Sequence, residues 1–150
     1  MTRGSENPDV AAKSILRVLF FEDHSADVEL SLWTHNSAGF EVTADVAVSV
    51  NAVLERVSAI EYDVILSDYR MPDATGLDLF RALKAEGASV PFILVTGSLG
   101  DETAVECLKE GVADYVLKDR LARLPMAVRR ALDERRLREE RALEHFLIEE

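Results

Sequence analysis

The stretch DVILSDYRMPDATG, residues 63–76, decides the fold of this chain. Three apolar residues lead through Ser67 to Asp68, and the YRMPD motif that includes Pro72 cannot continue either a strand or a helix. A short apolar run bounded by turn residues is typical of a strand that is buried on both faces of a sheet. The stretch therefore predicts a buried strand that presents one carboxylate, that of Asp68, at its carboxyl end.

Four similar apolar runs surround this strand, and segments with helical spacing separate them. The five runs are LRVLFF (16–21), FEVTADVAV (40–48), YDVILS (62–67), PFILVT (91–96) and ADYVLK (113–118), and the helical segments between them are 26–39, 49–60, 76–87 and 101–111. The run 40–48 alternates most and is the most polar, so we place it at an edge of the sheet. Because strand and helix alternate along the chain, we expect an α/β fold with a doubly wound five-stranded parallel sheet and helices on both of its faces.

The first helical segment carries the only tryptophan and two of the three histidines lie in or near it. We expect Val28, Leu32 and Trp33 to share the face that packs on the sheet. His24 and His35 have no metal-ligand spacing with each other, so we expect both at the surface.

The composition describes an acidic chain with one domain and a helical extension. The 150 residues carry a formal net charge of −11, which makes nucleic acid an unfavourable direct partner. Cys107 is the only cysteine, which excludes an internal disulfide and a cysteine-based metal site. No apolar run is long enough to cross a bilayer, so we expect a cytoplasmic protein without membrane insertion. We divide the chain into a disordered N-terminal tail (1–14), a domain (15–132) and a helical extension (133–150).

Polar residues follow the predicted strands at the edge where parallel α/β sheets bind their ligands. They are Glu22, Asp23, Asp68, Thr96 and Lys118. Converging carboxylates repel one another, and a hard divalent cation such as Mg²⁺ removes that repulsion while leaving room for a phosphate oxygen. Lys118 adds a fixed positive charge and Thr96 adds a hydroxyl donor. A carboxylate nucleophile with these neighbours predicts phosphoryl transfer to an aspartate.

These residues stand in motifs that resemble the response regulator receiver domain of two-component phosphorelay signalling. The matching motifs are Glu22-Asp23, ILSDYRMPDATGLDL (65–79), FILVTGS (92–98) and ADYVLKD (113–119), and the resemblance covers about residues 15–132. It implies a flavodoxin-like fold with strand order 2-1-3-4-5. It also implies a signalling domain rather than an enzyme, in which Asp68 accepts a phosphoryl group from a histidine kinase or a phosphotransfer protein in a Mg²⁺-dependent step.

The resemblance gives the carboxylates a shared metal site. The implied Mg²⁺ ligands are Glu22, Asp23, Asp68 and the backbone carbonyl of Arg70. Asp23 is the more direct ligand by resemblance, and Glu22 acts mainly through water. The alternative, that Glu22 and Asp23 only cap the following helix, is less favourable because Asp27 or Ser25 suits a cap better.

The resemblance also implies residues that receive the phosphoryl group or respond to it, namely Thr96, Gly97, Lys118 and Tyr115. A side chain at Gly97 would crowd an incoming phosphoryl group. By resemblance, Tyr115 turns inward when Thr96 engages the phosphate. The alternative for Tyr115 is a half-buried tyrosine with a solvated hydroxyl.

Two features depart from the common pattern of the family. Asp119 follows Lys118 where the family often has proline, and we expect a trans peptide because a cis non-proline bond costs about 3 kcal/mol. Arg70 and Ser98 occupy positions that, by resemblance, tune the hydrolysis of the phosphoaspartate.

Three other functions deserve comparison. An aspartate-nucleophile phosphatase of the haloacid dehalogenase type needs a second aspartate two residues after Asp68, where this chain has Arg70. A flavodoxin needs a first loop that cradles a phosphate, and the acidic EDHSAD (22–27) would repel one. A degenerate receiver that only binds partners remains an alternative, which the complete set of site residues disfavours.

A last helix is predicted from Pro125 to the end of the chain, longer than the sheet needs. Beyond Leu132 it is mostly charged but continues with the apolar residues Leu137, Leu143, Phe146 and Leu147. We expect these four side chains to form a stripe that supports a homodimer, together with the surface of 101–111 and 113–118, or that leads into a further module. The alternative is a solvated helix with frayed ends.

Overall fold

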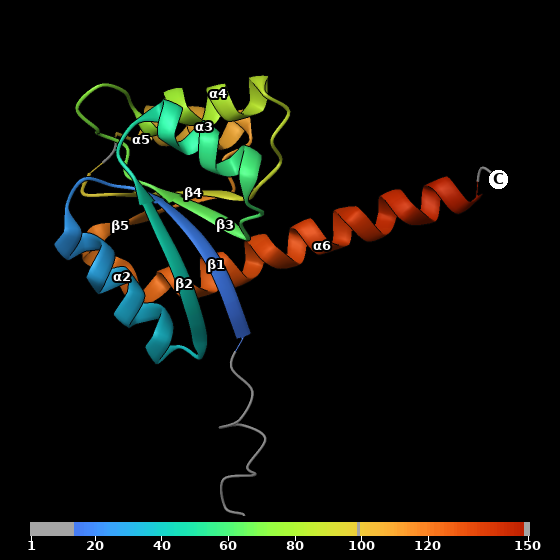
Figure 1. Ribbon diagram of the computed structural model, residues 1–150, viewed down its shortest axis with the longest axis horizontal. Helices are drawn as coiled ribbons and strands as arrows, with labels where there is room; N and C mark the ends of the chain where they lie inside the picture. The colour runs from blue at the N-terminus through green and yellow to red at the C-terminus, as the bar shows by residue number, and fades with distance from the viewer. Residues whose placement is uncertain (1–13, 99, 149–150) are drawn as a thin grey trace, which may run out of the picture.

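The sheet has five parallel strands in the order β2-β1-β3-β4-β5, in a computed structural model that describes residues 14–98 and 100–148 (Figure 1). The strands are β1 (Ser14–Phe21), β2 (Phe40–Ala47), β3 (Val64–Ser67), β4 (Phe92–Thr96) and β5 (Asp114–Leu117). The predicted flavodoxin-like order is confirmed, and the alternating run is the edge strand β2. The tail expected for residues 1–14 lies outside the described residues, apart from Ser14, which begins β1.

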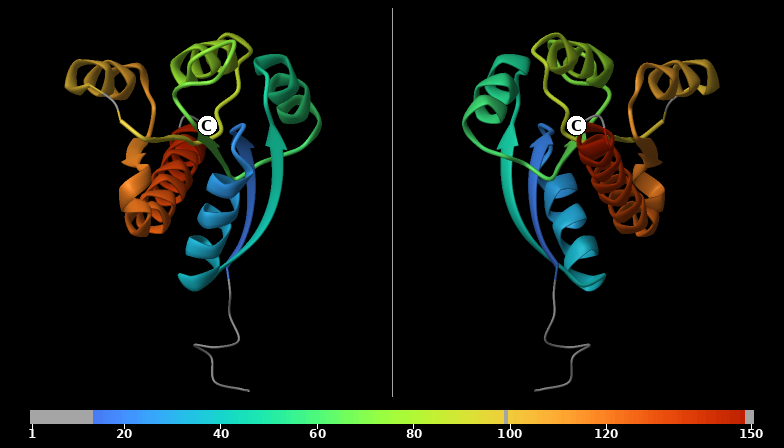
Figure 2. Two further views of the ribbon diagram at one scale, coloured as in Figure 1. Left: turned by 90° about the vertical axis from the view of Figure 1, so that its left-hand side faces the viewer. Right: turned by 90° about the vertical axis from the view of Figure 1, so that its right-hand side faces the viewer.

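Helices cover both faces of the sheet. They are α2 (Ser25–Ser37), α3 (Val50–Ala59), α4 (Gly76–Ala85), α5 (Asp101–Glu110), the 3₁₀ helix η2 (Lys118–Arg123) and α6 (Leu124–Ile148). Helices α2 and α6 lie on one face, whereas α3, α4 and α5 lie on the other (Figure 2). The long predicted C-terminal helix is confirmed as α6, which runs well past the edge of the sheet (Figure 1).

The side chains of β1 alternate between two hydrophobic cores. Val18 and Phe20 join the core shared with α2 and α6, whereas Leu19 and Phe21 join the core shared with α3, α4 and α5. All four side chains are buried, which explains why the strand reads as a continuous apolar run. Burial on both faces fixes the position of the strand and of the residues that follow it.

The predicted buried face of α2 is partly wrong. Val28 is buried, but Trp33 is 67% exposed, and the face toward the sheet is completed by Ser31 and His35. His35 is only 1% exposed, which corrects its expected surface position. Its Nδ1 lies 2.8 Å from the Ser31 carbonyl, its ring meets Phe40 edge-on, and its Nε2 is buried without a hydrogen-bond partner among the described residues. Burial lowers the pKa of the His35 imidazole below its usual value.

The helix α6 contacts the rest of the domain over about its first three turns, as far as Arg135, which donates to the Tyr62 carbonyl. Val128 and Ala131 are buried in the core, whereas residues 136–147 are exposed. Leu137 lies nine residues before Phe146 (146 − 137), which is two and a half turns, so the two side chains point to opposite sides of the helix. The expected single stripe of four apolar side chains is therefore wrong.

Two further backbone findings bear on the sequence predictions. The described residues contain no cis peptide bond, so the expected trans peptide between Lys118 and Asp119 is confirmed. Within the described part of the chain, every helix is either too short or too polar to span a membrane.

Candidate functional site

The phosphoacceptor candidate Asp68 is placed by the pairing of β3 with β1. Ser67 is in register with Phe21, and the Asp68 backbone N–H donates to the Phe21 carbonyl over 2.9 Å. Glu22 and Asp68 therefore leave neighbouring strands at the same level. Both side chains are nearly buried, Glu22 at 6% and Asp68 at 7% exposure, whereas Asp23 is exposed.

The predicted carboxylates converge. Oxygen atoms of Glu22, Asp23 and Asp68 and a ring nitrogen of His24 all lie within 4.8 Å of one another. Three carboxylates within this distance suit a hard divalent cation such as Mg²⁺. Two of them are largely removed from water, so solvent screens their mutual repulsion poorly and a bound cation would offset it. The donor set therefore fits the metal that the family resemblance implies.

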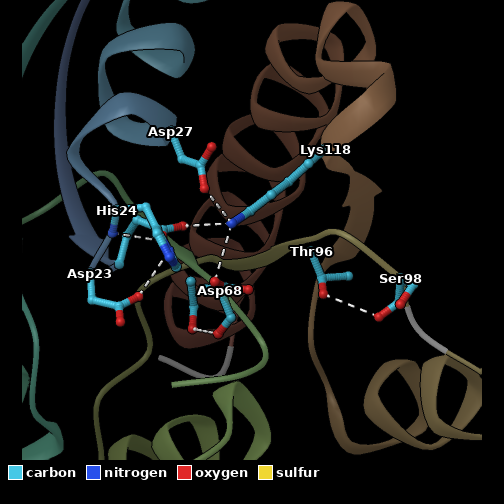
Figure 3. Close-up of polar contacts among 9 residues, drawn as sticks. Asp23, His24, Asp27, Asp68, Thr96, Ser98 and Lys118 are labelled. Carbon is cyan, nitrogen blue, oxygen red and sulfur yellow. Dashed lines mark hydrogen bonds and ion pairs between the residues drawn. The ribbon is translucent and has the colours of Figure 1, made fainter. Parts of the chain in front are cut away.

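The imidazole of His24 contacts two carboxylates of this acidic cluster. Its Nδ1 lies 3.2 Å from Glu22 Oε2 and 3.2 Å from Asp23 Oδ1 (Figure 3). The hydrogen bond to Glu22, with the charge of Asp23, raises the pKa of the His24 imidazole above its usual value. His24 is at the surface as expected, but its role beside the carboxylates was missed.

Lys118 reaches across from the end of β5 and binds three carboxylates at once. Its Nζ lies 2.7 Å from Asp27 Oδ2, 3.1 Å from Glu22 Oε1 and 3.1 Å from Asp68 Oδ2 (Figure 3). Burial opposes the charge, but the hydrogen bonds to Asp27, Glu22 and Asp68 outweigh it and raise the pKa of the Lys118 ammonium above its usual value. Lys118 is therefore a fixed cation beside the phosphoacceptor candidate.

Asp27 is the second residue that the sequence prediction missed. The sequence suggests Asp27 only as a helix cap, yet the N-cap of α2 is His24, which makes no side-chain cap hydrogen bond. Asp27 instead lies in the first turn of α2 and pairs with Lys118 at 2.7 Å. Its sequence position, one turn after the acidic pair on the strand exit, is the signal that could have placed it near the site.

The loop after Asp68 turns back so tightly that it requires glycine at position 76. A Cβ on Gly76 would lie 2.8 Å from the Asp68 carbonyl oxygen and 2.5 Å from a methyl carbon of Leu94. Gly76 also donates its N–H to Tyr69 over 2.8 Å, which closes the loop. The following helix begins with a capping box between Thr75 and the third helical residue. These contacts fix the backbone that carries Asp68.

The Arg70 carbonyl stays available in this loop. Arg70 bridges to Thr75 in antiparallel fashion, and the two hydrogen bonds of that bridge join the flanking pairs, Met71 N–H to Ala74 and Gly76 N–H to Tyr69. The bridge therefore does not consume the carbonyl of Arg70. Its predicted role as a metal ligand stays a prediction.

Thr96 ends β4 but faces its own loop. Its hydroxyl donates to the Ser98 carbonyl over 3.3 Å, on the far side of the site from Asp27 (Figure 3). The side chain is buried at 2% exposure. A Cβ built on Gly97 would meet no atom within 4 Å, so the fold itself does not require glycine there. The strand pairing puts Thr96 level with Leu117, one residue before Lys118.

Tyr115 is held at the edge of the second core. Its side chain is half-buried and packs against the core under α3, α4 and α5. Its backbone carbonyl accepts from Arg123 over 2.7 Å, which ties β5 to η2. This position fits both readings made from the sequence, and the switch role of Tyr115 stays a prediction.

The carboxylates of Asp68 and Glu22 both combine near-complete burial with a direct contact to Lys118, and each lies close to two further carboxylates. Such an arrangement can accept an electrophilic phosphorus on an Asp68 oxygen while a cation and an ammonium neutralise the oxygens of the arriving group.

Comparison with known proteins agrees with this geometry. Residues 18–129 match the family of the response regulator receiver domain. The chain is 36% identical over 121 residues to the C4-dicarboxylate transport transcriptional regulatory protein DctD of Rhizobium meliloti, a match that covers 79% of this chain and 26% of that protein. It is 31% identical over 122 residues to the cell cycle transcriptional regulator CtrA of Caulobacter vibrioides, covering 77% of this chain and 52% of that protein. The chain thus spans about half or less of these relatives.

Solved structures show the same fold. A response regulator receiver domain protein (CheY-like) from Methanospirillum hungatei JF-1 superposes with a TM-score of 0.69 at 25% identity, covering 83% of this chain and 99% of that one. The signal receiver domain of the putative response regulator NarL from Mycobacterium tuberculosis gives a TM-score of 0.69 at 24% identity, covering 80% and 98% of the two chains.

Proposed function

The chain belongs to the response regulator receiver domain family, and we propose on this basis that Asp68 accepts a phosphoryl group from a histidine kinase or a phosphotransfer protein. One observation carries the proposal: the nearly buried Asp68 carboxylate lies beside the acidic pair at the end of β1 and 3.1 Å from the ammonium of Lys118. A structural aspartate in a turn has no need of this surrounding.

In the proposed reaction an Asp68 oxygen forms a bond to phosphorus while the phosphorus–nitrogen bond of a phosphohistidine breaks. The histidine nitrogen leaves with the electron pair of that bond, and an acyl phosphate remains on Asp68. Mg²⁺ held by Glu22, Asp23 and Asp68 would neutralise the phosphoryl oxygens. Lys118 lies 3.1 Å from the Asp68 oxygen and would hold another phosphoryl oxygen in place.

We propose that Thr96 and Tyr115 report the phosphorylation. The Thr96 hydroxyl donates to Ser98 in the unphosphorylated chain, and the hydrogen bond is long at 3.3 Å. A phosphoryl oxygen, as a charged acceptor, would compete well for that hydroxyl. Release of the Ser98 carbonyl would loosen the loop after β4 and allow Tyr115 to move, as the family resemblance implies.

In this proposal the domain is a cytoplasmic signalling module. Phosphorylation changes its self-association through α6 and the neighbouring surface of α5 and β5. The rival phosphatase reading is disfavoured because the position two residues after Asp68 is Arg70, whose side chain is exposed and cannot act as a general acid.

The proposal is tested by intact-mass analysis of the full chain after incubation with a small acyl phosphate donor and Mg²⁺. We expect the wild type to gain one phosphoryl group and Asp68→Asn to gain none. Asp73→Asn removes a carboxylate from the same loop at an exposed position and is the matched control, which should behave as the wild type. Equal phosphoryl gain in Asp68→Asn would overturn the proposal, and no gain in any variant would favour the degenerate receiver.

A further inference from the structure

The acidic cluster at the candidate site contains a nitrogen donor beside its carboxylate oxygens. The Nδ1 atom of His24 lies 3.2 Å from Glu22 Oε2 and 3.2 Å from Asp23 Oδ1 (Figure 3), and an oxygen of Asp68 belongs to the same cluster, whose donor atoms lie within 4.8 Å of one another. An imidazole nitrogen is a good ligand for divalent transition ions such as Zn²⁺ and Co²⁺, whereas Mg²⁺ is bound through oxygen. The mixed donor set therefore suits a wider class of ion than the carboxylates alone.

The contacts of His24 have the spacing of ligands around one ion. At metal–ligand distances of about 2.1 Å, neighbouring ligand atoms are about 3.0 Å apart in an octahedral shell and about 3.4 Å apart in a tetrahedral shell. Both contacts of the His24 Nδ1 atom, at 3.2 Å, fall between these two values. The imidazole nitrogen thus already stands at ligand spacing from two carboxylates.

The carboxylate of Glu22 is oriented so that one of its oxygens faces His24. Its Oε1 lies 3.1 Å from the Lys118 ammonium, whereas its Oε2 accepts from the His24 backbone N–H over 3.1 Å. Because a carboxylate oxygen has two lone pairs, Oε2 can bind an ion and keep this hydrogen bond. Lys118 and a metal ion can therefore bind different oxygens of the same buried carboxylate.

The ring of His24 is available as a ligand because the helix that it precedes does not depend on it. His24 is the N-cap of α2 but makes no side-chain cap hydrogen bond, and its side chain is 67% exposed. An exposed side chain can adjust its position around an ion while the nearly buried Glu22 and Asp68 stay in place. The exposure also opens a path from solvent to these two carboxylates.

We propose that His24 makes this cluster a binding site for divalent transition ions. The ligands are the Nδ1 atom of His24 and oxygens of Glu22, Asp23 and Asp68, whereas Mg²⁺ binds the carboxylates without the imidazole. This inference deepens the metal site of the proposed function and rests on it, because it concerns which ions that site accepts.

The two kinds of ion leave the site in different states for phosphoryl transfer. An ion with four protein ligands in a tetrahedral shell has no position left for a phosphoryl oxygen, whereas octahedral Mg²⁺ keeps waters that a phosphoryl oxygen can replace. A transition ion held by His24 therefore inhibits the phosphorylation of Asp68 that Mg²⁺ supports.

Isothermal titration calorimetry of the untagged full chain with Zn²⁺ and, separately, with Mg²⁺ tests the proposal. We expect His24→Gln to weaken Zn²⁺ binding at least about tenfold, because it removes the nitrogen ligand. The same variant should bind Mg²⁺ at least as strongly as the wild type, because the imidazole no longer occupies the carboxylate oxygens. Asp23→Asn removes an oxygen ligand of both ions and should weaken both. His145→Gln removes another exposed histidine beside a glutamate and is the matched control, which should bind both ions as the wild type does.

The visible absorption of bound Co²⁺ is a second readout, which reports the ligand shell directly. Co²⁺ absorbs more strongly in a tetrahedral shell than in an octahedral shell of oxygens, so at saturation the wild type should absorb more strongly than His24→Gln. Equal Zn²⁺ affinity in the wild type and His24→Gln would overturn the proposal. Equal weakening of Zn²⁺ and Mg²⁺ in His24→Gln would overturn it as well, because His24 would then act by positioning the carboxylates.

Intact-mass analysis separates this inference from the proposed function. With Mg²⁺ present, added Zn²⁺ should slow the phosphoryl gain of the wild type and slow that of His24→Gln less, and equal slowing would overturn inhibition through His24. If the wild type gains no phosphoryl group with Mg²⁺ alone, the proposed function fails while the two affinities still decide the inference. If phosphorylation proceeds but His24→Gln binds Zn²⁺ as the wild type does, the inference fails and the proposed function stands.

Discussion

Lys118 lies closer to Asp27, at 2.7 Å, than to Asp68, at 3.1 Å, although Asp68 is the carboxylate on which the chemistry is proposed to occur. The ammonium is thus shared between the first turn of α2 and the strand end. It is held by Asp27, which lies outside the cluster of possible metal ligands, and in the proposed reaction Asp27 would compete with an arriving phosphoryl group for the same cation.

Asp27→Asn should therefore speed phosphorylation. It removes one negative charge beside Lys118, which lowers the repulsion of an anionic donor and frees the ammonium for a phosphoryl oxygen, so we expect the initial rate to rise about threefold. Time-resolved intact-mass analysis with a small acyl phosphate measures the rate. Glu29→Gln removes the same charge from an exposed position of α2 and is the control. A slower Asp27→Asn variant beside a normal Glu29→Gln would show instead that Asp27 is needed to position Lys118.

Metal affinity should depend most on Asp23. It is the exposed member of the acidic cluster, so it can approach a cation without a change in the core, and the other two carboxylates already contact Lys118. We expect Asp23→Asn to weaken Mg²⁺ binding about tenfold or more in isothermal titration calorimetry. Binding should also weaken at low pH because the carboxylates must be deprotonated. Unchanged affinity in Asp23→Asn, with Asp73→Asn as the charge control, would move the metal site elsewhere.

The two glycines near the site should respond oppositely to alanine. The Cβ of Gly76→Ala would press on the Asp68 carbonyl and on Leu94, and we expect a loss of about 1–3 kcal/mol in the free energy of unfolding, as for other overpacked sites. Gly97→Ala meets open space and should change stability by less than about 0.5 kcal/mol. If Gly97→Ala nevertheless slows phosphorylation, we would conclude that the added methyl group occupies the space that the arriving phosphoryl group needs. Urea unfolding and the mass assay, run on both variants, give the two readouts, and equal stability of the two variants would contradict the tight loop.

His35 should make the fold sensitive to mild acid. Burial lowers the pKa of His35 in the folded chain, whereas the unfolded chain protonates it near its usual value of 6.5. Below that pH the unfolded state binds the extra proton, so the free energy of unfolding falls as the pH falls, by up to about 1.4 kcal/mol per pH unit from this residue. Well above pH 6.5 both states hold a neutral imidazole, and the residue no longer changes the free energy of unfolding with pH.

His35→Phe keeps an aromatic ring against Phe40 and removes the titration. The difference in unfolding free energy between pH 7.5 and 5.5, measured in urea, should be smaller for the variant than for the wild type. An identical pH dependence in the two proteins would mean that His35 is accessible to protons in the folded state.

The sheet and the strand ends could be predicted because each depends on a local pattern. Buried parallel strands are continuous apolar runs, and their carboxyl ends meet at one edge, so the convergence of Glu22, Asp23, Asp68 and Lys118 follows from order alone. The predicted phosphate-binding role of Thr96 stays a prediction, because its hydroxyl donates to the Ser98 carbonyl.

The face of α2 could not be predicted by seeking large apolar residues. The buried positions Val28, Ser31 and His35 follow helical spacing from Val28, but two of them are polar, and Trp33 is apolar yet points outward. Periodicity was the better guide than residue type here, because the sheet fixes the angle of the helix and the residues at that angle are buried whatever their polarity. Asp27 was missed for a related reason. Its link to the site depends on Lys118, a residue far away in the sequence that extends from the end of β5 to Asp27.

The helix α6 follows η2 directly, and the backbone between Lys118 and α6 bends at Arg120, whose φ of −131° and ψ of 41° are not helical. The 25 residues of α6 make a rod of about 37 Å. A tilt of about 5° at the first turn of α6 would move the far end of the helix by about 3 Å. The exposed end of α6 is therefore a lever arm, in which a small displacement where the helix leaves the domain becomes a larger movement at Leu147.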